Sequence, residues 1–169
     1  MVLRRRHNIY TWRDSKDKLP GEIGISVMRG HTDNEGKNPD PNIFPDSFTE
    51  HIQNLGPPRW LVAWWYQGNK LEGADIERRE EMFGRDYINY LRTPEPLALA
   101  KGLIRRAMTM PIAILCKEPF PQFCHRHLLT EFLRRLSPTL PIGPPLDAPY
   151  LRRLKHAFES VHPSDHSSF

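Results

Sequence analysis

Apolar residues recur every three or four positions along much of the chain, which is the spacing of one face of an α-helix. This pattern predicts helices at 46–55, 59–66, 74–91, 94–107, 125–136 and 151–161. The clearest start is at Thr93, where a capping residue precedes Pro94 in the first turn and an early acid, Glu95. The chain is therefore rich in amphipathic helices.

Three short segments break this periodicity and predict strands instead. They are 8–12, 24–29 and 111–116, rich in β-branched, aromatic or continuously apolar residues. The last of these has an unbroken apolar run, as expected of a central strand covered on both faces. Because it lies between two predicted helices, it favours a parallel arrangement. We predict an α/β fold, with a small, mostly parallel sheet flanked by helices.

The length of 169 residues suits one domain. We expect residues 1–161 to form it and 162–169 to be a disordered tail, and we expect a long loop at 30–45, which is rich in Gly, Asn, Asp and Pro. No apolar run approaches the roughly 18 residues of a membrane span. The N-terminus has no secretory pattern and only two cysteines occur, so we expect a cytoplasmic protein without membrane contact.

The charge balance is slightly basic. There are 24 Lys and Arg residues against 20 Asp and Glu residues, a formal charge of +4. Such an excess favours an anionic partner. Arginine pairs recur on the predicted helices, among them Arg105 and Arg106, and a shared face would bind phosphates. Arg59 and Trp60 could add stacking to nucleobases, although core packing is the favoured reading of the aromatic run that they begin.

The residues richest in chemistry follow the predicted central strand. Cys124 stands between a strand and a helix, where ligands bind in open α/β sheets. Unpaired N–H groups and the helix dipole at this point attract anions and lower the pKa of a thiol. Arg126 supplies a guanidinium suited to phosphate, and His125 a group that exchanges protons near neutral pH. Arg29, at the end of a predicted strand, is expected to point into the same cleft.

Four interpretations of this segment remain open. We favour an anion site at the helix start over a nucleophilic Cys124, because a reactive thiol needs both a lowered pKa and access. A zinc site made by Cys116, Cys124 and a histidine is disfavoured, because no paired CxxC or HxxxH spacing occurs. The fourth is a purely structural role. Cysteine-phosphatase chemistry is also disfavoured, because Thr130 stands where that pattern needs an arginine.

The same segment resembles a known family. The runs Leu115-Cys116-Lys117-Glu118-Pro119 and Cys124-His125-Arg126-His127-Leu128-Leu129 look like the hallmark of domain of unknown function 488 (DUF488). Leu55-Gly56-Pro57-Pro58 and Phe83-Gly84-Arg85-Asp86-Tyr87 are similar to further segments of that family, whereas Ser26 stands where the family has an acidic residue. The resemblance implies an α/β fold and a site around Arg29, Cys124, His125 and Arg126.

These observations lead to one expected function. We expect an enzyme acting on an anionic substrate, a nucleotide or nucleic acid such as DNA or RNA, without metal or other cofactor. Arg29, Lys117 and Arg126 would bind the anion, and Cys124 or His125 would do covalent or acid–base work. The alternatives are a non-catalytic nucleic-acid-binding module, with contacts from Arg59, Trp60, Arg105 and Arg106, and a structural or partner-binding protein.

Overall fold

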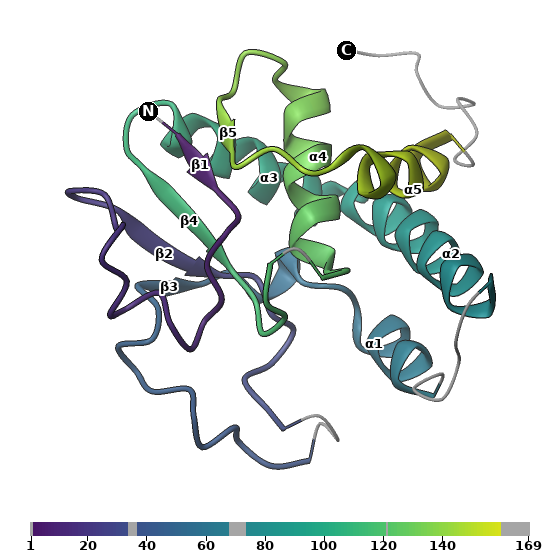
Figure 1. Ribbon diagram of the computed structural model, residues 1–169, viewed down its shortest axis with the longest axis horizontal. Coiled ribbons are helices and arrows are strands. Elements are labelled where there is room, and N and C mark those ends of the chain that lie inside the picture. The colour runs from purple at the N-terminus through teal and green to yellow at the C-terminus, as the bar shows by residue number, and fades with distance from the viewer. Residues whose placement is uncertain (1, 34–36, 68–73, 121, 160–169) are drawn as a thin grey trace.

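A five-stranded, all-parallel sheet forms the centre of the protein. The computed structural model describes residues 2–33, 37–67, 74–120 and 122–159. The strands are β1 (Leu3–Arg4), β2 (Ile23–Ser26), β3 (Glu50–His51), β4 (Ile112–Leu115) and β5 (Ile142–Gly143), in the order β3-β2-β4-β1-β5 (Figure 1). The apolar run predicted as a central strand is therefore β4, which pairs with β2 on one side and β1 on the other.

The described residues also form five α-helices and one 3-10 helix. They are η1 (Gln53–Leu55), α1 (Arg59–Tyr66), α2 (Ala74–Leu91), α3 (Pro94–Ala107), α4 (His125–Leu136) and α5 (Ala148–Glu159). The predicted α/β class is confirmed, as are the helices predicted at 59–66, 74–91, 94–107 and 125–136. The helix predicted at 151–161 begins earlier, at Ala148, and is described as far as Glu159. None of the described helices is long and apolar enough to cross a membrane.

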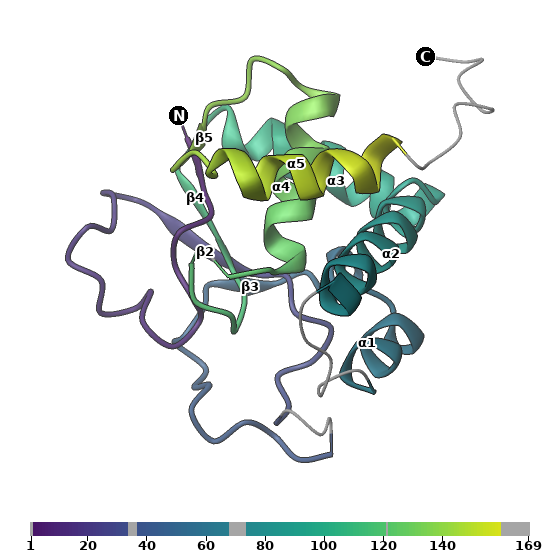
Figure 2. The ribbon, with the colours of Figure 1, turned by 45° about the vertical axis from the view of Figure 1, so that its right-hand side comes forward.

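Alternate residues of β4 supply two separate cores. Ile112 and Ile114 pack with the helices, whereas Ala113 and Leu115 pack on the opposite face with Ile9 and other residues of the N-terminal segment. Figures 1 and 2 show the helices gathered against one face, with long loops over the other. Both faces of β4 are thus covered, which explains its unbroken apolar sequence.

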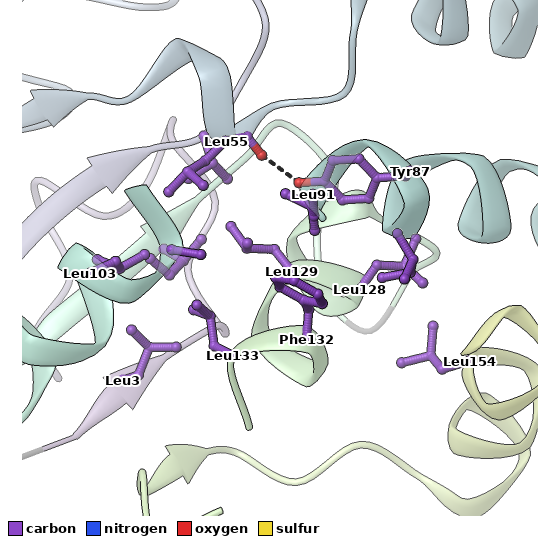
Figure 3. Close-up of a cluster of buried hydrophobic side chains, with 14 of the residues drawn as sticks. Leu3, Leu55, Tyr87, Leu91, Leu103, Leu128, Leu129, Phe132, Leu133 and Leu154 are labelled. Carbon is purple, nitrogen blue, oxygen red and sulfur yellow. Dashed lines mark hydrogen bonds between the residues drawn. The ribbon is translucent and has the colours of Figure 1, made fainter. Parts of the chain in front are cut away.

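Helix α4 is the centre of the larger core. Leu128, Leu129, Phe132 and Leu133 of this helix are buried among side chains from the sheet and the other helices (Figure 3). In the same cluster the hydroxyl of Tyr87 donates a hydrogen bond to the carbonyl of Leu55 (Figure 3). Burial on this scale fixes the start of α4 against the ends of β2 and β4.

Two of the predicted elements were wrong. Residues 8–12 form a turn rather than a strand, because the Asn8 side chain accepts hydrogen bonds from the backbone N–H groups of Tyr10 and Thr11. Residues 46–55 do not form an α-helix, and only 53–55 are helical, as the 3-10 helix η1. The backbone N–H groups of Thr49 and Ile52 instead donate to carbonyls of β2, so this segment adds β3 to the sheet edge. Tertiary pairing there outweighs the local helical spacing.

The remaining expectations concern loops. The described parts of 30–45 contain no helix or named strand, as predicted, apart from one bridge between Thr32 and Pro39. The segment between α4 and α5 contains β5, which pairs with β1. The expected disordered tail, 162–169, lies outside the described residues.

Candidate functional site

A cleft of about 750 Å³ opens at the carboxyl ends of β2 and β4. Its walls come from the segment after β2, from α1, and from the loop between β4 and α4 with the first residue of α4. They include Arg29, Arg59, Tyr66, Lys117, Cys124 and His125. Parallel strands and a following helix create such a crevice because the chain turns away from the sheet at this edge. The cleft is where the sequence placed the site.

Four side chains in the cleft converge on one point. They are Cys116, Glu118, Cys124 and His125, and their potential ligand atoms all lie within 4.8 Å of one another. The thiols of Cys116 and Cys124 both donate to Oε2 of Glu118, at 2.8 and 3.2 Å. The Cys116 sulfur lies 3.7 Å from each ring nitrogen of His125. We call these four residues the thiol–carboxylate cluster. Thiolate, imidazole and carboxylate groups are the usual protein ligands of zinc.

Backbone positions hold the cluster in shape. Cys116 directly follows β4, and its carbonyl accepts a hydrogen bond from the N–H of Ile9. Cys124 is the N-cap of α4, where its sulfur accepts from the N–H of Arg126 at 3.4 Å. The Nε2 atom of His125 lies 2.9 Å from the carbonyl of Val27, just beyond β2. Three separate segments therefore fix the four side chains.

The electrostatics of Cys124 are the reverse of the sequence expectation. Burial raises the pKa of this thiol well above its usual value, and the neighbouring Cys116 and Glu118 raise it further. The positive charge of Arg126 lowers it by less. A helix start alone does not produce a thiolate when the sulfur is only 3% exposed. The expected low thiol pKa is therefore wrong for this state of the protein.

The pKa of Glu118 is shifted in the opposite direction to that of Cys124. Burial raises its pKa, but the charge of His125 and the hydrogen bonds from the two thiols together hold that pKa below the usual value. The carboxylate is thus ionised and accepts a hydrogen bond from each thiol. It is a group in the cluster that can accept a proton.

Arg126 does not face the cleft, contrary to the sequence expectation. Its side chain is completely buried and donates to the backbone carbonyls of His7 and Glu118, the latter at 2.9 Å. The guanidinium joins the N-terminal segment to the loop after β4. It stabilises the backbone on the side of the site that faces away from the cleft. The expected pair of substrate-binding arginines, Arg29 and Arg126, is therefore not formed.

Two predicted anion-binding residues do line the cleft. Arg29 donates to the Asn54 side chain at 2.8 Å, and its Nε is buried without a hydrogen-bond partner among the described residues. Lys117 contacts the carbonyl of Thr32 and pairs with Asp40 at 2.8 Å. Burial raises the pKa of Asp40, but hydrogen bonds from Lys117, the Asn42 N–H and Tyr10, together with the Lys117 charge, lower it to about 2. Arg29 and Lys117 therefore lie beside the thiol–carboxylate cluster, whereas Arg126 lies behind it.

The predicted nucleic-acid contacts are not brought together. Arg59 lines the cleft and Trp60 is 59% exposed beside it on α1. Arg105 is exposed in the last turn of α3, and Arg106 forms an ion pair with Glu50 at 2.6 Å. The opposite end of α3 is the one near the cleft, because Glu95 there accepts from the Asn54 side chain. The two arginine groups thus belong to different parts of the surface.

Sequence reasoning missed two residues of the site. Glu118 follows Cys116 by two positions after a strand, a spacing that returns a side chain to the same side. This Cys-x-Glu pattern was an available signal. Tyr150, from α5, was invisible locally, because its hydroxyl meets Cys124 across 26 positions of sequence.

The fold and the site together define a parallel α/β protein with a thiol, carboxylate and imidazole cluster at the carboxyl edge of its sheet. The chain belongs to the family described as domain of unknown function DUF488, whose model matches residues 47–133, just over half of the chain. The match contains all four residues of the thiol–carboxylate cluster. No curated protein and no solved structure matches the chain.

Proposed function

We propose that the protein is an enzyme acting on an anionic substrate, a nucleotide or the phosphate-bearing end of a nucleic acid, bound in this cleft. The observation that carries the proposal is the presence in one cleft of cationic side chains and of the thiol–carboxylate cluster. Cations supply binding energy for phosphate, and the cluster supplies groups that exchange protons.

The cations have donors to spare. Arg59 is exposed and has no ion pair or hydrogen bond within the described residues. Arg29 uses Nη1 for its contacts with Gln53 and Asn54, so its other terminal nitrogen has no partner among the described residues, and the ammonium group of Lys117 has three donors for its two observed contacts. Three donor groups around one cleft suit a phosphate better than a single carboxylate.

The size of the cleft and its aromatic wall favour a small ligand. A volume of about 750 Å³ lies within the range of roughly 300–1,000 Å³ typical of small-molecule sites. Trp65 and Tyr66 line it, and Trp65 is already stacked on Phe123 at a centroid distance of 5.1 Å. A flat base can pack against such a wall. These features favour a nucleotide over a duplex.

Glu118 supports the chemistry that we assign to Cys124 and His125. Its Oε2 lies 3.2 Å from the Cys124 sulfur, so the carboxylate orients the thiol and is placed to receive its proton as the sulfur bonds to a substrate. His125 provides a second proton-exchanging group beside Cys116. The proposed chemistry therefore uses a thiol hydrogen-bonded to a carboxylate. The sequence had suggested an isolated thiol of low pKa instead.

The test is nucleotide binding and turnover with matched arginine variants. Fluorescence of Trp65 in the cleft reports binding of ribonucleoside and deoxyribonucleoside mono-, di- and triphosphates, and chromatography reports any product. We expect Arg59→Ala to weaken binding about tenfold, or about 1.4 kcal/mol. Arg78→Ala is the control, because Arg78 is also exposed on a helix but does not line the cleft. Glu118→Gln should abolish product formation.

Two results would overturn the proposal. One is the absence of binding by every nucleotide in the panel and by short single-stranded oligonucleotides. The other is an equal loss of affinity in the Arg59 and Arg78 variants, which would show that attraction depends on total charge rather than on the cleft.

One observation favours the non-catalytic alternative. Trp60 is the most exposed large apolar side chain among the described residues, and it adjoins Arg59. If the protein is a non-catalytic nucleic-acid-binding module, Trp60→Ala should weaken oligonucleotide binding, and that binding should depend steeply on salt. Glu118→Gln should leave binding unchanged, and neither the wild type nor the variant should form product.

A further inference from the structure

We propose that Cys116, Glu118, Cys124 and His125 bind a divalent transition-metal ion of the zinc type. The four side chains are the thiol–carboxylate cluster in the floor of the cleft. The inference deepens the proposed function and rests on it for any catalytic meaning of the ion. Binding of the ion itself can be measured without a substrate.

The first argument is the convergence of the donor atoms. One carboxylate oxygen contacts both sulfurs, and one sulfur lies 3.7 Å from the imidazole nitrogens. In a tetrahedral zinc site, bond lengths of about 2.0–2.3 Å place neighbouring ligand atoms about 3.3–3.8 Å apart. The imidazole is at that spacing already, and small rotations of the thiol and carboxylate side chains provide the rest. Two sulfurs, one nitrogen and one oxygen form a donor set suited to zinc.

The second argument is the orientation of the imidazole. Nε2 of His125 lies 2.9 Å from the Val27 carbonyl, which can only accept, so Nε2 carries the proton. The Cys116 sulfur is equidistant from the two ring nitrogens, at 3.7 Å, and Nδ1 is the nitrogen that the Val27 carbonyl leaves for a metal. A histidine that binds a metal usually donates its other N–H to a carbonyl or carboxylate in this way. The ring is thus held in the tautomer that a ligand needs.

The buried positive charge of Arg126 also favours a metal ion at the cluster. The guanidinium of Arg126 is completely buried and contacts two backbone carbonyls, with no carboxylate partner within the described residues. The N–H of the same residue donates to the Cys124 sulfur. A divalent ion bound by two thiolates and one carboxylate carries a net charge of −1, which the buried guanidinium offsets. The ion displaces the two thiol protons to solvent and nothing is oxidised or reduced.

The cluster can also be reached by an ion from the cleft. All four residues line the cleft, although the two cysteines are nearly buried. An ion therefore has an entry path, and once bound it faces the space proposed for the substrate. The closest competing chemistry is a disulfide between Cys116 and Cys124, which are unpaired cysteines in this structure.

The experiment is a metal titration of the full chain. Protein stripped with a chelator and kept reduced is titrated with Zn²⁺ against a chromophoric chelator, and with Co²⁺ to detect thiolate charge-transfer absorption. We expect one equivalent per chain, and a rise in melting temperature with added Zn²⁺. Cys116→Ser and His125→Gln should each weaken Zn²⁺ binding about 100-fold, with loss of the cobalt–sulfur absorption in Cys116→Ser. His156→Gln, an exposed histidine on α5, should change nothing.

Three outcomes would overturn the metal site. The first is binding of less than a tenth of an equivalent of Zn²⁺, and the second is equal Zn²⁺ affinity in Cys116→Ser and wild type. The third is a protein isolated with a disulfide between the two cysteines that still binds no metal after reduction. If Cys124→Ser fails to fold, the Cys116 and His125 variants decide the question. Nucleotide binding measured on stripped protein separates the two proposals, because Arg59 contacts the cleft without belonging to the cluster.

Discussion

The hydroxyl of Tyr150 accepts a hydrogen bond from the backbone N–H of Cys124 at 3.1 Å, so the last helix of the chain holds the first turn of α4. The same hydroxyl lies 2.9 Å from Nδ1 of His127. Burial and the nearby Arg126 lower the pKa of His127 to about 2, so this ring is neutral and accepts the hydroxyl proton. Tyr150 thus fixes the N-cap residue of the site.

We expect Tyr150→Phe to reduce the free energy of unfolding by about 1–3 kcal/mol, because a buried N–H group and a buried ring nitrogen lose their shared partner. Tyr66→Phe is the control, since its hydroxyl makes no hydrogen bond with the described residues. Urea denaturation followed by far-UV circular dichroism measures both. Equal stability of the two variants would show that the Tyr150 hydroxyl does not support α4.

Arg126→Met should lower the free energy of unfolding by about 2–5 kcal/mol, because the carbonyls of His7 and Glu118 lose their buried donor. Arg134→Met on the same helix should cost less than Arg126→Met, because Arg134 is exposed and its partner, the buried Glu131, keeps a second ion pair with Arg135 at 3.7 Å. Thermal and urea unfolding test this. A stable Arg126 variant that lost only nucleotide affinity would restore the substrate-binding role expected from the sequence.

Stability should fall with acid through His31. Burial, with smaller contributions from the charges of His51 and Lys117, lowers the pKa of this ring to about 4. Its Nε2 lies 2.8 Å from the hydroxyl of Ser26, and the ring packs on Phe48 and His51. The unfolded chain protonates histidine near pH 6.5, so stability is complete above that pH and is lost as pH falls towards 4.

The measurement is the slope of unfolding free energy against pH between 7 and 5, a range in which most carboxylates stay ionised. His31→Gln should make the slope shallower, while His156→Gln, exposed on α5, should keep it. The slope that remains comes from His7 and His127, whose pKa values are also lowered by burial. Unchanged slope in His31→Gln would contradict the assignment.

Gly56→Ala and Gly102→Ala should act in opposite directions. A Cβ at Gly56 would stand 2.6 Å from the Val27 carbonyl oxygen and 2.8 Å from the Arg29 nitrogen, both backbone atoms beside the cleft. We expect a loss of about 1–3 kcal/mol, with weaker Zn²⁺ binding because Val27 orients His125. At Gly102, in α3, the nearest atom is 3.8 Å away, so alanine should stabilise the helix by about 0.5–1 kcal/mol. Urea unfolding tests both, and equal effects would refute the close approach at Gly56.

The sequence by itself determined the helices and the central strand, because their apolar periods are long and match the burial that they reach. Helices α2, α3 and α4 and strand β4 fall where their patterns predict. It also singled out Cys124 and His125, which line the cleft, since a polar motif between a buried strand and a helix lies at the sheet edge.

Only the tertiary structure decided the two-residue strands and the chemistry of the site. Strands β1 and β5 are two residues long, too short for a period, and exist because neighbouring strands supply their hydrogen bonds. Likewise, the helix start at Cys124 suggested an acidic thiol, yet packing buries the sulfur and turns Arg126 away from the cleft. Local sequence sets propensity and position, whereas the pKa of a thiol and the direction of a guanidinium depend on what the rest of the chain places around them.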